Sequence, residues 1–279
     1  MYSINAKAVL NLNKRNNNES KSDIYFVILQ DIESAEPFEK TVVFDFDHTI
    51  IDANSDIHVS KLFPSDEKRL VAEKNCSQFQ CWTDRMQDIF RQLHKYHIKE
   101  NDYIKNMQEI PLTDGFKHLI EYLYSLPNSH LIIVSDSNLI FIQTILKHNH
   151  LHHIFKDIFT NPAYFNKDDQ CLIIEQYGQQ TCPTCPSNMC KNEIIEKYCR
   201  TKFSQSIPIL FIGDGHNDVC AANNLKKGDL VCARSGYRMA KELKQQEKLN
   251  IKKLQADFFE WNDGKQIEDY IKDNWLNKF

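Results

Sequence analysis

Two short apolar runs in this 279-residue chain each lead into an acidic residue, and this feature constrains the fold most strongly. The run at 41–44 (TVVF) leads directly into Asp45, and the run at 207–212 (IPILFI) leads into Gly213 and Asp214. Runs rich in β-branched and aromatic residues are typical of buried parallel strands. The carboxyl ends of such strands carry the chemistry in open α/β sheets. The sequence therefore predicts a parallel sheet with catalytic acids along one edge.

Strand and helix patterns alternate along much of the remaining chain. Helical spacing of apolar residues covers 116–126, and two further buried strands are expected at 131–134 and 230–233. Strands that are separated by helices pair in parallel through crossover connections. The pattern predicts an α/β fold with a Rossmann-like doubly wound parallel sheet.

The segment 57–111 has no strand run and is interpreted as a small helical cap inserted after the first catalytic strand. Apolar residues from Trp82 to Leu93 recur there at helical spacing. This helix face is interpreted as the core of the cap, or alternatively as the lining of an active-site entrance. The α/β core then comprises 39–56 and 112–279. A cap of this kind closes over small substrates and excludes bulk water.

Residues 1–38 are rich in Asn, Lys and Ser and show little periodicity, so a poorly ordered leader is predicted there. Its basic residues leave a mitochondrial transit peptide open as an alternative. The low arginine content of the segment disfavours that alternative.

Composition and charge limit the partners and the compartment. The net charge of −4 provides no basic field, so a small molecule is a more plausible partner than nucleic acid. We find no signal-peptide pattern and no apolar run of about 20 residues, so we expect a cytoplasmic chain that does not span a membrane. The nine cysteines are accordingly expected to be reduced thiols.

Asp45 and Asp47 are the strongest candidates for catalysis. Because they are two positions apart, they project from the strand end on the same side. One carboxylate can then attack phosphorus while the other transfers protons. Two neighbouring carboxylates also favour a hard divalent cation such as Mg²⁺.

Three further segments offer groups that phosphate chemistry needs. Ser135 ends a predicted strand before a helix, where it either holds phosphate oxygens or caps the helix. Lys191 is either a surface lysine or a cation that pairs with the nucleophile and the phosphoryl group. The segment Gly213-Asp214-Gly215-His216-Asn217-Asp218 combines glycines suited to a tight turn with two acids that can complete a metal site.

These segments carry a resemblance to a known superfamily. The sequence D-x-D-x-T at 45–49, Ser135, Lys191 and G-D-G-x-N-D at 213–218 resemble the four motifs of the haloacid dehalogenase superfamily. Within it, the resemblance is to the PHOSPHO-type phosphatases and covers roughly residues 40–265. The longer stretches that carry it are FDFDHTIIDANSD (44–56), VSDSN (134–138), FTNPAYF (159–165), CPTCPSNMCK (182–191) and IGDGHNDVC (212–220).

The resemblance implies a Mg²⁺-dependent phosphomonoesterase that works through an aspartyl-phosphate. Asp45 is then the nucleophile, and Asp47 is the general acid and afterwards the general base. It also implies that the metal is held by the Asp45 carboxylate, the Asp47 backbone carbonyl and the Asp214 carboxylate. Asp218 is expected in the outer shell around the metal, where it orients a metal-bound water or Lys191.

The resemblance also implies a substrate. Asp56 and Asp136 match positions that contact the amine-bearing end of the substrate, which favours phosphoethanolamine or phosphocholine. The alternative for both residues is that they cap the helices that follow them. The alternative substrate is pyridoxal phosphate or another vitamin phosphate.

A cysteine cluster motivates an alternative interpretation in which the protein is not an enzyme. In that case the chain is a zinc-stabilised binding module without activity. Cys182, Cys185 and Cys190 form a C-x2-C-x4-C pattern, but a structural zinc site needs a fourth ligand. Cys199 or a histidine could supply that ligand. We expect free or packed thiols and less than one zinc per chain. The intact acids and lysine of the four motifs argue against a degenerate active site.

Overall fold

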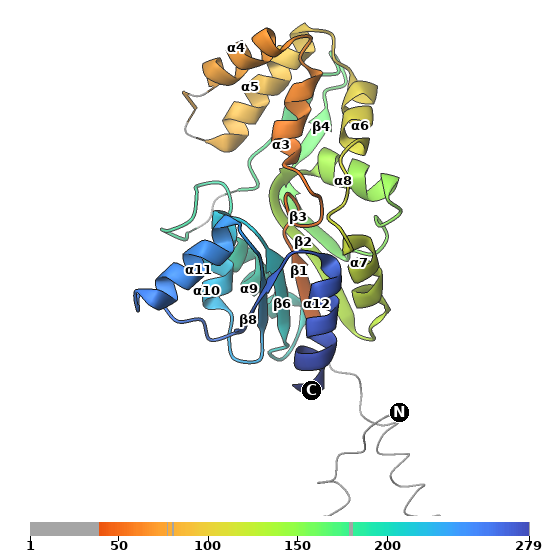
Figure 1. The fold of residues 1–279 in the computed structure, drawn as a ribbon. Helices are drawn as coiled ribbons and strands as arrows, with labels where there is room; N and C mark the ends of the chain where they lie inside the picture. Colours follow the sequence, from red (N-terminus) through yellow and green to blue (C-terminus); the bar gives the residue numbers. More distant parts are fainter. Residues whose placement is uncertain (1–38, 77, 80, 179–180, 279) are drawn as a thin grey trace, which may run out of the picture. The chain divides into compact units, whose positions relative to one another are not determined.

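A six-stranded parallel sheet is the centre of the fold in this computed structural model (Figure 1). The structure describes residues 39–76, 78–79, 81–178 and 181–278. The predicted leader at 1–38 lies outside the described residues. None of the described helices has the length and the apolar character that a membrane span requires.

The sheet order places one strand at a topological switch point. The strands follow the order β3-β2-β1-β6-β7-β8, and every neighbouring pair is parallel. They are β1 (Lys40–Phe44), β2 (Ser129–Asn138), β3 (Asp157–Asn161), β6 (Ile209–Gly213), β7 (Leu230–Arg234) and β8 (Asp257–Trp261). The chain builds outward from β1 to β3 and then returns to the other side of β1. This confirms the Rossmann-like doubly wound sheet. In such sheets ligands bind where the strand order reverses, which in this chain is between β1 and β6.

The two faces of the sheet pack against different helices. Val42 and Phe44 point to the face that packs against α7 (Phe116–Ser125), α8 (Leu139–His148) and α12 (Gly264–Tyr270). Val43, of opposite parity, belongs to the other face. That face is covered by α9 (Lys191–Lys202), α10 (Val219–Asn224) and α11 (Arg238–Lys248). Short helical turns lie at η2 (His216–Asp218), η3 (Ile271–Trp275) and η4 (Leu276–Lys278).

The four strands predicted from apolar runs are all present, and the edge strands were missed. Both β3 (DIFTN) and β8 (DFFEW) contain acidic or amide side chains and are only partly buried along most of their length. An edge strand has a neighbouring strand on one side only. It is therefore less buried than a central strand, and its sequence does not need a continuous apolar run.

Helices fill the segment between β1 and α7, where the cap was predicted (Figure 1). They are α3 (Ser55–His58), η1 (Val59–Leu62), α4 (Asp66–Cys76), α5 (Trp82–Lys95) and α6 (Glu100–Gln108). The apolar face of α5 is buried at Phe90 and Leu93, whereas Trp82 remains 41% exposed.

A small hairpin from later in the chain joins these helices. The strands β4 (Ala163–Phe165) and β5 (Leu172–Ile174) pair antiparallel. The Gln87 side chain of α5 donates to the Leu172 carbonyl at 3.2 Å and accepts from the Ile174 amide at 2.9 Å. Residues 39–279 form one compact unit, so the division into cap and core remains an interpretation.

Candidate active site

The acids of two motifs meet at the switch point between β1 and β6. Asp45 follows β1, and its backbone amide donates to the Ile212 carbonyl of β6 at 2.9 Å. Asp45, Asp214 and Asp218 are buried, and each offers a carboxylate oxygen within 4.8 Å of the others. Adjacent parallel strands therefore bring together residues that are far apart in the sequence.

Lys191 is buried among these acids rather than lying on the surface. It is the first residue of α9 and only 1% exposed. Its Nζ lies 2.8 Å from Asp45 Oδ1 and 2.6 Å from Asp218 Oδ1. Burial acts to lower the pKa of Lys191, but Asp218 and Asp45 outweigh that effect and raise it. The lysine is therefore a permanent cation that bridges two carboxylates.

Asp218 is occupied by structural contacts. Its Oδ2 accepts the backbone amides of Asp214 at 3.1 Å and Gly215 at 2.8 Å, while Oδ1 contacts Lys191. A Cβ on Gly213 would lie 2.6 Å from the same Oδ2, which explains the glycine at this strand end. With these contacts, Asp218 is suited to orienting Lys191 and the Asp214 loop.

The buried carboxylates outnumber the ammonium group of Lys191, and the pKa of Asp214 reflects this excess of negative charge. Burial, Asp45 and Asp218 raise the pKa of Asp214 to about 9. Its Oδ1 accepts a weak hydrogen bond from the Thr49 hydroxyl at 3.4 Å. A cluster of hard oxygen donors with excess negative charge fits Mg²⁺ well.

Asp47 lies beside this cluster, and Ser55 holds its carboxyl group. The backbone amide and the hydroxyl of Ser55 both donate to the Asp47 carboxylate at 3.1 Å. Ser55 Oγ also lies 2.9 Å from Ser137 Oγ at the end of β2. Burial and the nearby Asp56 raise the pKa of Asp47 well above its usual value. A neutral carboxyl group in this position can donate a proton.

Ser135 and Asp136 lie in the last part of β2, and neither caps the next helix. The cap of α8 is Asn138, whose Oδ1 accepts the Phe141 amide at 3.1 Å, so the capping alternative is wrong for both residues. Ser135 is fully buried. The Asp136 carboxylate accepts a hydrogen bond from Asn217 Nδ2 at 3.1 Å.

Asp56 also fails to cap its helix and instead holds an aromatic side chain. The cap of α3 is Asn54, which accepts the Ile57 amide at 2.9 Å. The indole of Trp82 donates to Asp56 Oδ2 at 2.6 Å. Burial raises the pKa of Asp56 to about 7, although the hydrogen bond from Trp82 opposes the shift.

A cavity of about 680 Å³ connects several of these groups. Its lining residues are Cys81, Trp82, Asp84, Asp136, Pro186, Ser187, Asn188, Met189, Lys191 and Asn217. The cavity thus reaches from the catalytic lysine candidate to the start of α5. Asp56 is not among the described residues that line it.

Sequence reasoning missed the residues that hold the site together. Arg234 ends β7 and donates to the His48 carbonyl and to Asp52 Oδ1, both at 2.6 Å. It thereby braces the loop that carries Asp47. Its place at a strand end was a usable signal, because polar residues at this edge of the sheet serve the site.

Two buried asparagines were missed in the same way. Asn188 Nδ2 donates to Asn161 Oδ1 at 2.9 Å, and Asn161 Nδ2 donates to the Asp136 carbonyl at 2.6 Å. They tie the loop before Lys191 to the end of β2. Their only signal in the sequence was membership of the longer matching stretches.

Comparison with known proteins gives the family. The family described as "Putative Phosphatase" matches residues 40–274. The chain belongs to this phosphatase family. It is a PHOSPHO-type phosphatase of the haloacid dehalogenase superfamily and a phosphomonoester hydrolase.

The relatives of this phosphatase differ in the substrates for which they are named. A pyridoxal phosphate phosphatase from Bos taurus is 34% identical over 236 residues, or 83% of this chain and 96% of the relative. A phosphoethanolamine/phosphocholine phosphatase from Gallus gallus is 26% identical over 249 residues, which cover 86% of this chain and 90% of the relative. Among solved structures, apo phosphoserine phosphatase shares the fold with a TM-score of 0.55 at 18% identity, covering 83% of this chain and 98% of that one.

Proposed function

We propose that the phosphatase hydrolyses small phosphomonoesters with Asp45 as its nucleophile. The observation that carries this proposal is the contact set of that carboxylate. Asp45 Oδ1 accepts the Phe46 amide at 2.7 Å and lies 2.8 Å from Lys191 Nζ. Among the described residues both contacts fall on Oδ1, so Oδ2 is the oxygen that attacks phosphorus and forms the aspartyl-phosphate.

Asp47 moves the protons in both half-reactions. With its raised pKa it donates a proton to the leaving oxygen as the ester P–O bond breaks. As a carboxylate it then takes a proton from the water that attacks the phosphorus of the aspartyl-phosphate. That attack releases phosphate and restores the Asp45 carboxylate. Lys191 and the buried hydroxyl of Ser135, in the last part of β2, hold the phosphoryl oxygens during these steps.

The oxygen donors of the site fit Mg²⁺ as the cofactor. The ion would be held by the Asp45 carboxylate, the Asp214 carboxylate and the Asp47 backbone carbonyl. Asp218 would lie in the outer shell around the ion. When bound, Mg²⁺ supplies positive charge that offsets the carboxylates and the substrate dianion.

Removal of divalent metal is expected to lower turnover by about 10²-fold, because several kcal/mol of charge stabilisation are lost. Phosphate release is measured in chelator and again after Mg²⁺ is added back in excess. An equal concentration of Ca²⁺ serves as a control for general ionic effects. Full activity in excess chelator would contradict the role of the metal.

Asp47→Asn is expected to slow both half-reactions, by about 10²- to 10⁴-fold in total, because one group serves as acid and then as base. Rapid-quench measurements with radiolabelled substrate separate formation of the phosphoenzyme from its breakdown. Unchanged single-turnover chemistry combined with weaker substrate binding would exclude this role.

We propose pyridoxal phosphate, or a similar aromatic phosphate, as the substrate class. The support in the structure is Trp82, whose indole lines the cavity and is fixed by Asp56. Asp56 Oδ2 is therefore already paired with Trp82. Relatives named as pyridoxal phosphate phosphatases are 32–34% identical to this chain, which also favours this substrate.

Phosphoethanolamine or phosphocholine remains the second candidate. Asp84 and Asp136 line the cavity beside Trp82, and acids next to an aromatic face suit an ammonium group. The less similar relatives carry this activity in their names.

The two candidates are separated by kcat/KM for each substrate in matched variants. Trp82→Leu is expected to lower kcat/KM for pyridoxal phosphate by about tenfold, because stacking contributes about 1–3 kcal/mol, and to affect phosphoethanolamine less. Tyr124→Leu, an exposed aromatic on α7, is the control and is expected to change neither. The second candidate would be established instead by two results together. The unmodified enzyme would prefer phosphoethanolamine, and Asp136→Asn would lower kcat/KM for phosphoethanolamine selectively.

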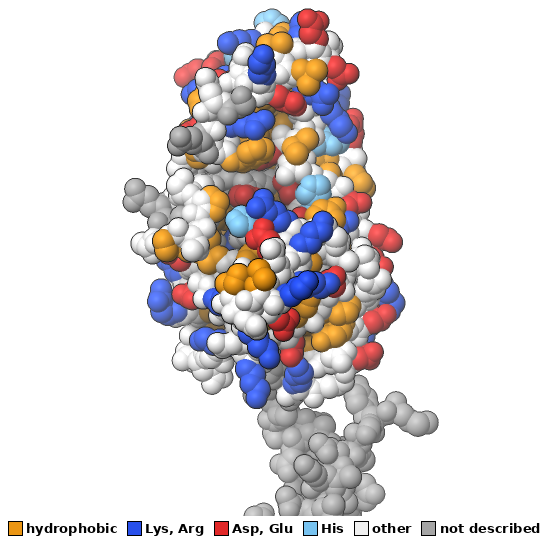
Figure 2. Space-filling model, turned by 60° about the vertical axis from the view of Figure 1, so that its left-hand side comes forward, with side chains coloured by type: hydrophobic (Ala, Val, Ile, Leu, Met, Phe, Trp, Pro, Cys, Tyr) orange, Lys and Arg blue, Asp and Glu red, His pale blue; other side chains and the backbone are white. Residues whose placement is uncertain are grey.

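We also propose a cytoplasmic location and a small-molecule partner. None of the described cysteines takes part in a disulfide, which suits a reducing compartment. Lys and Arg side chains are mixed with Asp and Glu over the face in Figure 2, rather than gathered as nucleic-acid binding requires.

A further inference from the structure

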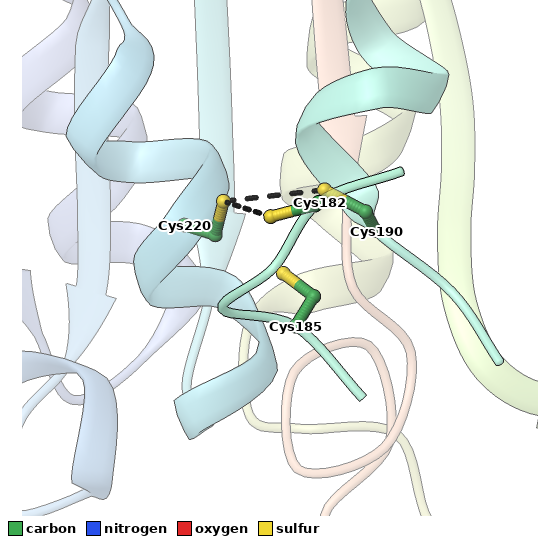
Figure 3. A group of neighbouring side chains, drawn as sticks. All are labelled: Cys182, Cys185, Cys190 and Cys220. Carbon is green, nitrogen blue, oxygen red and sulfur yellow. Dashed lines mark hydrogen bonds between the residues drawn. The ribbon is translucent and has the colours of Figure 1, made fainter. Parts of the chain in front are cut away.

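Four cysteine side chains converge on one point beside the active site (Figure 3). Cys182 and Cys185 lie on the loop before α9, Cys190 caps that helix, and Cys220 lies on α10. Their sulfurs all lie within 4.8 Å of one another. Cys220 therefore lies where the sequence pattern lacked a fourth ligand, and Cys199 is not part of the group. This geometry departs from the free or packed thiols expected from the sequence.

The sulfur separations match a shared tetrahedral ion. Ligands at about 2.3 Å from a tetrahedral Zn²⁺ lie about 3.8 Å from one another. The Cys182 and Cys220 sulfurs are 3.7 Å apart, and the Cys190 and Cys220 sulfurs are 3.9 Å apart. A disulfide would need about 2.05 Å. We propose that Cys182, Cys185, Cys190 and Cys220 bind one structural Zn²⁺ ion.

Polar groups lie near two of the four sulfurs, those of Cys182 and Cys220. The Thr184 hydroxyl lies 3.2 Å from Cys182 Sγ and 4.0 Å from Cys220 Sγ, and Asn224 Nδ2 lies 3.8 Å from Cys220 Sγ. Such polar groups around the ligands orient them and spread their negative charge. Without a cation, burial raises the pKa of Cys190 to about 11. A bound dication removes that penalty, since zinc binds the thiolate form.

The ion would join the two segments that carry the buried ion pair of the active site. Cys190 directly precedes Lys191, and Cys220 follows Asp218 by two residues. A four-sulfur site leaves no position open for substrate, which is typical of structural rather than catalytic zinc. The ion therefore fixes the lysine loop onto α10 and takes no part in phosphoryl transfer.

The experiment measures metal bound to the full chain. Protein is dialysed against excess Mg²⁺ without chelator, which displaces other ions from the oxygen-liganded site, and zinc and iron are then counted by mass spectrometry. We expect about one zinc per chain, loss of that zinc in Cys220→Ala, and full retention in Cys199→Ala. Cys199 lies on α9 outside the cluster and so is a matched control.

A second measurement covers the case in which Cys220→Ala does not fold. Protein produced with Co²⁺ is expected to show the visible bands and the sulfur-to-cobalt charge-transfer absorption of a tetrahedral thiolate site. Zinc far below one per chain, iron in its place, equal loss in Cys199→Ala, or cobalt without thiolate absorption would each overturn the proposal. Because the readout is metal content, it does not depend on activity.

Discussion

Asp45→Asn is expected to abolish turnover, by roughly 10⁴-fold or more, while the fold stays intact. The amide has nearly the shape of the carboxylate but is a poor nucleophile, so no aspartyl-phosphate forms. Phosphate release and acid-stable labelling of the protein with radioactive substrate are the measurements.

Asp168→Asn is the matched control, because this aspartate lies on the exposed turn between β4 and β5. It is expected to keep full activity. Substantial turnover in purified Asp45→Asn, or continued labelling of that variant, would exclude the covalent mechanism.

Lys191→Met is expected to cost both activity and stability. Removing the ammonium leaves Asp45 and Asp218 buried without their shared cation. Breaking a buried pair from one side typically lowers the free energy of unfolding by about 3 kcal/mol or more. Turnover is expected to fall by about 10³-fold, since the phosphoryl group loses a charged partner.

The stability loss carries a pH signature. Burial and the nearby Asp45 raise the pKa of Asp218 to about 6 even with Lys191 in place. Loss of the lysine removes a contact that opposes this shift, so the deficit is expected to shrink as Asp218 is protonated between about pH 8 and about pH 5. Urea unfolding measured in chelator at several pH values tests this. Lys202→Met, an exposed lysine on the same helix 3.7 Å from Asp157, is the control and is expected to be nearly neutral. A deficit that does not vary with pH would show that packing, rather than charge, causes the loss.

The central strands could be predicted from sequence because their burial on both faces imposes continuous apolar runs. In β1 every residue is buried, and its pattern needs no long-range information. By contrast, β8 lies at an edge and mixes charged with aromatic residues, so the same rule finds nothing there. Local pattern thus reports burial, and burial is weakest at the edges of the sheet.

The acids of the candidate site could also be predicted from local pattern, because they follow predicted strands. The residues that contact them could not. Asp45 and Asp214 stand at predicted strand ends, and a parallel sheet brings such ends together. The contact between Asp56 and Trp82 depends instead on how the helices α3 and α5, which lie apart in the sequence, pack against each other. The approach of Cys220 to the cysteine loop likewise depends on the packing of α10 against α9. Contacts of this kind follow from tertiary structure and leave no periodic signal.

The hairpin β4–β5 has a consequence for anyone who redesigns this enzyme. Leu172 and Ile174 are nearly inaccessible, and the backbone of β5 shares two hydrogen bonds with Gln87 of α5. A chimaera that exchanged only 57–111 with a relative would set foreign helices against this hairpin. Substrate preference is therefore expected to transfer between homologues as a two-segment module, in which the helices and the hairpin are exchanged together.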